Sequence, residues 1–87
     1  MILAIDIGNS TVIVGCADET SHRIIGRLAA LRHKTEDEYA IDFKRLLELS
    51  GIPAESLTGA IVASVVPPMS RIIREAVYKV TGYWPLL

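Results

Sequence analysis

The segment from Asp6 to Thr11, near the N-terminus, has the composition of a phosphate-binding turn. Glycine lets a backbone approach a ligand closely, and Gly8 stands in the middle of the segment. The backbone amides, the side-chain amide of Asn9 and the hydroxyls of Ser10 and Thr11 can all donate hydrogen bonds to phosphate oxygens. Together these donors suit a polyphosphate anion.

Asp6 sets the charge of this segment. Alone it would repel a phosphate, so its useful role beside one is to hold hydrated Mg²⁺, which prefers carboxylate oxygens and keeps several waters. Aspartate, glycine and asparagine are also preferred wherever a chain turns sharply between strands. Spacing alone therefore supports a metal and phosphate site and a plain hairpin turn about equally.

The two commonest phosphate-binding motifs are excluded. The turn has no lysine and no Gly-x-x-x-x-Gly-Lys pattern, so it is not a Walker loop. It also lacks the Gly-x-Gly-x-x-Gly pattern of a dinucleotide fingerprint. Any phosphate site here belongs to another class.

Three strands are predicted around the turn. The apolar run Ile2 to Ile5 precedes it, and the β-branched run Thr11 to Ala17 follows. A polar turn at 18–21 then leads to a third strand over Arg23 to Leu31. The chain thus opens with a three-stranded meander.

A helix is predicted from Glu36 to Ser50. Thr35 and Glu38 form a capping box before it, and Gly51 with Pro53 ends it. The acidic residues of its first turn are explained by capping and the helix dipole rather than by a metal. Four residues form an apolar stripe expected to pack on the sheet: Tyr39, Phe43, Leu46 and Leu47.

The second half of the chain predicts a strand, a helix and a further strand. Gly59 to Val66 is almost wholly apolar, as expected for an interior strand covered on both faces. Pro68 can begin a helix that Gly82 ends, and a last strand is expected from Tyr83. The predicted order is β-β-β-α-β-α-β in one α/β domain.

Composition limits the classes of partner. The 87 residues are 51% hydrophobic and carry nine basic and ten acidic side chains without a basic stripe, which argues against binding to nucleic acid or to a membrane surface. Cys16 is the only cysteine, and no apolar run is long enough to span a membrane. The opening residues lack a basic leader, which predicts a cytoplasmic protein.

Three segments carry a family resemblance over the whole chain. Ala4 to Ser10 resembles the first phosphate motif of the type III pantothenate kinases. Thr35 to Tyr39 resembles the threonine and acidic stretch that opens the family's first helix. Ala63 to Pro68 resembles its Ser-Val-Val-Pro signature at a strand end. Order and separation match as well.

The resemblance implies a ribonuclease H-like domain of the superfold shared by actin, sugar kinases and Hsp70. The implied activity is the ATP-dependent phosphorylation of pantothenate to 4′-phosphopantothenate, the first step of coenzyme A synthesis. ATP, Mg²⁺ and a monovalent cation, K⁺ or NH₄⁺, are the implied cofactors. The full-length protein is expected to be a homodimer.

Site residues follow from the same resemblance. It implies that the ATP phosphate segment runs from Asp6 to Ile13, with Asp6 at the metal. The whole segment is expected to bind the cofactor: Asp6, Ile7, Gly8, Asn9, Ser10, Thr11, Val12 and Ile13. Family members usually carry a hydroxyl residue where Val12 stands, so one donor is absent from this chain.

Residues 1–87 are expected to form the N-terminal ATP phosphate-binding subdomain of a two-domain kinase, truncated before the catalytic segment. In the family the catalytic aspartate lies in a Gly-x-Asp-Arg segment, which this sequence lacks. The isolated chain is therefore expected to be inactive, because phosphoryl transfer needs both reactants positioned. The alternatives are a non-catalytic accessory or regulatory protein of the same fold and an actin-like or Hsp70-like ATPase.

Further candidates for a functional role are Ser64, His22, His33 and Cys16. Ser64 ends a buried strand and can face a cleft, but a serine there is more often satisfied by neighbouring backbone groups. The two histidines and the cysteine lack partner ligands at useful spacing, so none of them is assigned a role.

Overall fold

Alternating apolar residues build the inner face of an antiparallel meander. The computed structural model describes residues 1–86, and its first three elements are β1 (Ile2–Ile7), β2 (Thr11–Ala17) and β3 (His22–Ala29). Every second residue of β1 and β2 is buried, as a period of two requires when one face of a sheet is covered. The predicted meander is confirmed.

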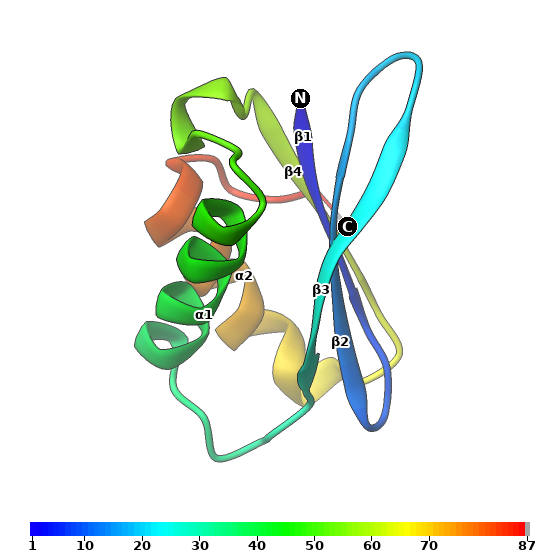
Figure 1. Ribbon diagram of the computed structural model, residues 1–87. Coiled ribbons are helices and arrows are strands. Elements are labelled where there is room, and N and C mark those ends of the chain that lie inside the picture. The colour runs from blue at the N-terminus through cyan, green and yellow to red at the C-terminus, as the bar shows by residue number, and fades with distance from the viewer. Residues whose placement is uncertain (87) are drawn as a thin grey trace.

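A fourth strand joins the meander in parallel. β4 (Gly59–Ser64) pairs with β1, so the order across the sheet is β3-β2-β1-β4. The connection from β3 to β4 contains α1 (Glu36–Leu49) and the short 3₁₀ helix η1 (Ala54–Ser56). α2 (Pro67–Thr81) follows β4, and both long helices cover the same face of the sheet (Figure 1). The fold is a mixed α/β fold.

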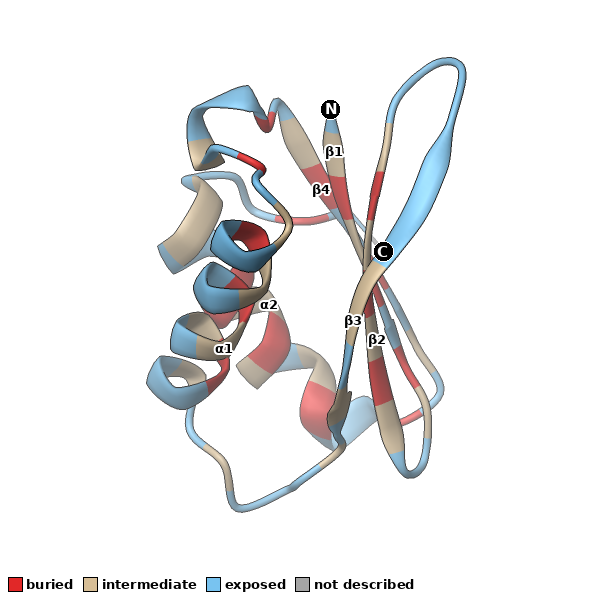
Figure 2. Ribbon diagram, viewed as in Figure 1, coloured by how far each residue is buried: buried red, intermediate tan, exposed pale blue. Residues whose placement is uncertain are grey.

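The core lies between the sheet and the two helices, where the buried segments of Figure 2 face one another. Its largest members include the aromatic rings of Tyr39 and Phe43, whose centroids lie 6.0 Å apart, and Leu3, Ile7 and Ile73, all fully buried. The opposite face of the sheet has no helix over it in the part of the chain that is described. This second face is called the open face below.

The predicted start of α1 and the predicted end of α2 are both confirmed. The capping box at α1 is formed, because Thr35 accepts a hydrogen bond from the Glu38 N–H and Glu38 in turn accepts one from the Thr35 N–H. Gly82 ends α2 with φ 78°, a left-handed conformation that glycine adopts without strain. The Lys79 ammonium pairs with the Asp37 carboxylate and so links the two helices.

Two predictions about the later strands need correction. β4 is not covered on both faces, since Ile61 is 41% exposed and Ala63 is also exposed. Its apolar sequence reflects small and β-branched residues on an open face rather than burial on both sides. Within residues 1–86, β4 also borders no full strand on its outer side: Leu86 makes a single parallel bridge to Ile61, where a strand was expected from Tyr83.

Boundaries differ slightly elsewhere, and Leu87 lies outside the described residues. β3 ends at Ala29 rather than Leu31, because the following loop bonds to α1 and leaves the sheet. Neither helix in residues 1–86 has the length and apolar character required to cross a membrane.

Candidate phosphate-binding site

The turn between β1 and β2 is short and held by backbone bonds. The Gly8 N–H donates to the Thr11 carbonyl at 2.9 Å, which closes the hairpin. The Ala30 N–H donates to the Ser10 carbonyl at 3.0 Å, which ties the turn to the chain leaving β3. Asn9 lies at the exposed tip. The turn is therefore fixed by its backbone.

Asp6 lies on the open face at the end of β1. Its neighbours Ile5 and Ile7 point into the core, so the alternation of the strand turns the Asp6 carboxylate outward. It stands opposite Ile13 of β2 on one side and Ala63 of β4 on the other. Within residues 1–86, no ion pair involves this carboxylate.

The eight residues of the predicted segment divide into two groups. Ile7 and Val12 are fully buried in the core, so only their backbone groups can meet a ligand. The side chain at position 12 points toward the helices and away from a phosphate held above the turn. The remaining six are exposed or half-buried around the turn and the open face: Asp6, Gly8, Asn9, Ser10, Thr11 and Ile13.

A second hairpin in the same chain shows what a purely structural turn looks like. At the turn from β2 to β3, one carboxylate oxygen of Asp18 accepts hydrogen bonds from the Thr20 N–H at 2.9 Å and the Ser21 N–H at 2.8 Å. These bonds, with weaker ones from the Thr20 and Ser21 hydroxyls, lower the pKa of Asp18. Here the polar side chains hold the turn together.

The β1–β2 turn does not use its polar side chains in this way. In the described part of the chain, the side chains of Asp6, Asn9 and Ser10 take part in none of the hydrogen bonds that shape the turn. A carboxylate, an amide and a hydroxyl are therefore presented together without an internal partner. This favours the ligand-binding interpretation over that of a plain hairpin.

Gly8 is not required by the fold. Its φ lies outside the left-handed region, and a Cβ added there would lie 3.4 Å from the Thr11 carbonyl oxygen, an ordinary contact. The chain could therefore accept a side chain at this position without strain. What glycine provides is an uncovered backbone on which a ligand can rest.

The end of β4 lies beside the site and is held there by local hydrogen bonds. The Val65 N–H donates to the Ile7 carbonyl at 3.1 Å, and the Ser64 hydroxyl accepts from the Val66 N–H at 3.0 Å. Accepting this bond gives the Ser64 hydroxyl a structural role at the end of β4. α2 begins with Pro67 and Pro68, which lack N–H groups, so its N-terminus offers a weak anion site.

The other candidate residues have structural surroundings. Cys16 is buried on the helix-facing side of β2, and this burial raises the pKa of its thiol, so it is a poor nucleophile. No group of three or more histidine, cysteine or acidic residues that could hold a metal occurs within residues 1–86. Mg²⁺ does not need such a group, because it binds one or two carboxylates together with phosphate oxygens and water. Asp6 beside the turn fits that requirement.

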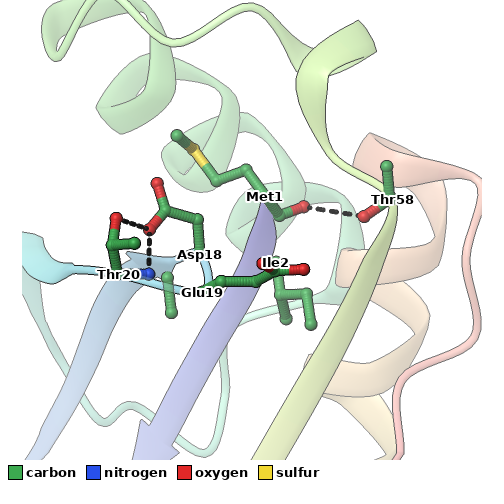
Figure 3. Close-up of a pocket in the computed structure, with 7 residues that line it drawn as sticks. Met1, Ile2, Asp18, Glu19, Thr20 and Thr58 are labelled. Carbon is green, nitrogen blue, oxygen red and sulfur yellow. Dashed lines mark hydrogen bonds between the residues drawn. The ribbon is translucent and has the colours of Figure 1, made fainter.

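A hollow of the surface lies away from this turn. It has a volume of about 650 Å³ and is lined by residues at the opposite end of β1: Met1, Ile2, Ala17, Asp18, Glu19, Thr20 and Thr58 (Figure 3). Its polar groups are largely committed, since Asp18 bonds to Thr20 and the Thr58 hydroxyl donates to the Met1 carbonyl at 3.3 Å. The hollow is open to solvent and offers few free donors for a nucleotide.

Comparison with known proteins decides the family. A sequence model described as type III pantothenate kinase matches residues 2–87. The chain belongs to the type III pantothenate kinase family. It is 33% identical over 87 residues to the type III pantothenate kinase of Moorella thermoacetica, a match that covers 100% of this chain and 34% of the relative. The chain thus spans about a third of that relative's length.

The family resemblance read from three short segments is therefore confirmed. The sequence did not single out Arg27, which faces the open side of the sheet in the same row as Asp6. The strand register is needed to place Arg27 on this face. A bulge at Val14 and Gly15 shifts the alternation of β3, so the sequence of β3 alone does not show which face Arg27 occupies.

Proposed function

We propose that this chain supplies the ATP phosphate-binding part of a kinase that phosphorylates pantothenate. The observation that carries the proposal is the contrast between its two hairpin turns. The Asp18 carboxylate accepts the hydrogen bonds that hold its own turn. The side chains of Asp6, Asn9 and Ser10 make no such bonds in the described residues, because backbone bonds already fix their turn. Family membership supports ATP as the phosphoryl donor and pantothenate as the acceptor.

Each part of the segment has a distinct task in this proposal. Asp6 holds Mg²⁺, which neutralises charge on the phosphates. The backbone amides around Gly8, with the side chains of Asn9, Ser10 and Thr11, donate to phosphate oxygens. Ile7, Val12 and Ile13 contribute position rather than donors, because the buried Ile7 and Val12 anchor both strands in the core.

The sheet supports assignment to the ribonuclease H-like superfold. Three antiparallel strands precede a helical connection to β4, which returns parallel to β1. Leu86 then bridges the outer edge of β4 in parallel, the position at which a fifth strand would extend the sheet. Assignment to the ribonuclease H-like superfold rests on this strand topology together with family membership.

The remaining machinery belongs to the proposal for the longer protein. Since the chain spans 34% of its relative, we place the catalytic aspartate, the pantothenate contacts and the site for K⁺ or NH₄⁺ in segments outside residues 1–87. Residues 1–87 would then be one subdomain of a two-domain, homodimeric kinase. Alone, this subdomain would be inactive because it positions ATP but not pantothenate. A non-catalytic accessory protein would show nucleotide binding without transfer even at full length.

Nucleotide binding to the chain tests this proposal directly. We expect Mg·ATP to shift the amide NMR signals of residues 6–13, and Asp6→Asn to weaken that binding about tenfold or more, the effect of losing a charged ligand. Asp18→Asn is the matched control, since Asp18 lies at the opposite hairpin, and it should leave affinity unchanged. Equal affinities for Asp6→Asn and wild type would refute the metal role.

A further inference from the structure

Three residues from three strands form one row across the open face. Asp6 pairs with Ile13, and Ile13 pairs with Arg27, so all three side chains point to the same side of the sheet. Neighbouring strands lie about 4.8 Å apart, which places the Cα atoms of Asp6 and Arg27 on the order of 10 Å apart. A carboxylate and a guanidinium thus stand on either side of Ile13.

Arg27 is uncommitted, unlike two other basic residues of this region, Arg23 and Lys34. Lys34 pairs with Asp42 and lies 5.0 Å from the centre of the Tyr39 ring. Arg23 points to the helix side, where its guanidinium donates to the Ser50 carbonyl at 3.0 Å. Arg27 is exposed and, in the described residues, takes part in no ion pair.

A site that holds a polyphosphate beside the Asp6 carboxylate needs a positively charged group to offset the negative charge. Asp6 alone adds a negative charge beside a polyphosphate, and the N-terminus of α2 contributes little because Pro67 and Pro68 have no N–H. A guanidinium presents paired donors that match phosphate geometry and keeps its charge at any working pH. Arg27 is also carried by a strand that pairs with β2 on both sides of a bulge, which fixes its backbone position.

We propose that Arg27 is a phosphate-binding residue of the nucleotide site, contacting the oxygens of a terminal phosphate while Asp6 holds the magnesium ion. This inference rests on the proposed function and assigns the site a second charged residue. Ile13 separates the two charged groups, which leaves room between them for a Mg-bound phosphate. The open face near the turn is then one wall of the nucleotide site.

Removing magnesium distinguishes the two charged residues. ATP affinity of the 87-residue chain is measured by calorimetry with Mg²⁺ and again in EDTA, for wild type, Arg27→Gln, Asp6→Asn and the control Arg45→Gln on the outer face of α1. We expect Arg27→Gln to weaken ATP binding roughly 10- to 100-fold in both conditions, since it loses a bond between opposite charges. Asp6→Asn should weaken binding only when Mg²⁺ is present. Arg45→Gln should match wild type in both.

The possible results separate this inference from the proposed function. If Asp6→Asn weakens Mg·ATP binding while Arg27→Gln binds like wild type, the role of Arg27 is overturned and the proposed function stands. If wild type binds no ATP at millimolar concentration, both are overturned. A loss for Arg27→Gln that appears only with Mg²⁺ would also overturn direct phosphate contact. Amide spectra of each variant, unchanged away from the substitution, confirm that the fold is retained.

Discussion

The Tyr39 hydroxyl accepts a hydrogen bond from the Leu31 N–H at 2.8 Å, which joins helix α1 to the chain leaving β3. The same hydroxyl lies 3.2 Å from the carbonyl oxygens of Ala29 and Leu31, to either of which it can donate. The intervening Ala30 N–H donates to the Ser10 carbonyl in the candidate phosphate turn. A buried tyrosine thus supports the turn through one stretch of backbone.

Tyr39→Phe should destabilise the chain. The ring stays packed in the core, but the partly buried hydrogen bond from the Leu31 N–H is lost, and a typical bond of this kind contributes about 0.5–1.5 kcal/mol. Urea unfolding monitored by circular dichroism measures the change in the free energy of unfolding. Tyr78→Phe is the matched control, because Tyr78 is 52% exposed on α2. Equal stability of the two variants would show that the Tyr39 hydroxyl bonds contribute nothing.

Gly8→Ala should separate folding from ligand binding. The added methyl group meets only an ordinary contact, so the free energy of unfolding should change by less than about 1 kcal/mol. Mg·ATP affinity should fall, because the methyl group covers the backbone on which the phosphate is proposed to rest. Gly59→Ala, at the opposite end of the sheet with open space around it, should change neither quantity appreciably. Undiminished affinity in Gly8→Ala would argue against close approach of a phosphate.

Local signals in the sequence were enough to predict most of the fold. The strand β2, the capping box at Thr35 and the stop at Gly82 depend on neighbouring residues, and each is confirmed. The burial of β4 depends instead on what packs against it, and the prediction from its apolar run, a strand covered on both faces, is wrong. An apolar sequence does not report how many faces are covered, so Ile61 and Ala63 were placed wrongly.

The candidate site was predicted only in part for a similar reason. Asp6 to Thr11 is contiguous in sequence, so its composition is visible without a structure. Arg27 reaches the same row only through two strand pairings and a bulge, none of which the sequence displays. Likewise, the difference between the Asp6 and Asp18 turns is a matter of hydrogen-bond partners, which residue types alone do not specify.

Acid should weaken the turn at Asp18 through its carboxylate. Hydrogen bonds from the Thr20 and Ser21 N–H groups lower the pKa of Asp18 below its ordinary value of 3.8, because they favour the ionised form. A lowered pKa in the folded chain means that this stabilisation is fully present above the unfolded-state pKa and disappears as the pH falls through the folded-state pKa. The Asp18 contribution should therefore be constant at neutral pH and decline below about pH 4.

Asp18→Asn isolates this contribution, since the amide oxygen can still accept the same hydrogen bonds but carries no charge. Urea titration measures the free energy of unfolding between about pH 2 and 7, the range over which carboxylates titrate. Below about pH 4 this free energy should fall less steeply in the variant than in wild type. Carbon-detected NMR of the Asp18 carboxyl group in wild type should give a midpoint below the ordinary aspartate value. Because the group is exposed, added salt should reduce the effect. Parallel stability curves for the two proteins, together with an ordinary midpoint, would mean that the turn does not depend on the charge of Asp18.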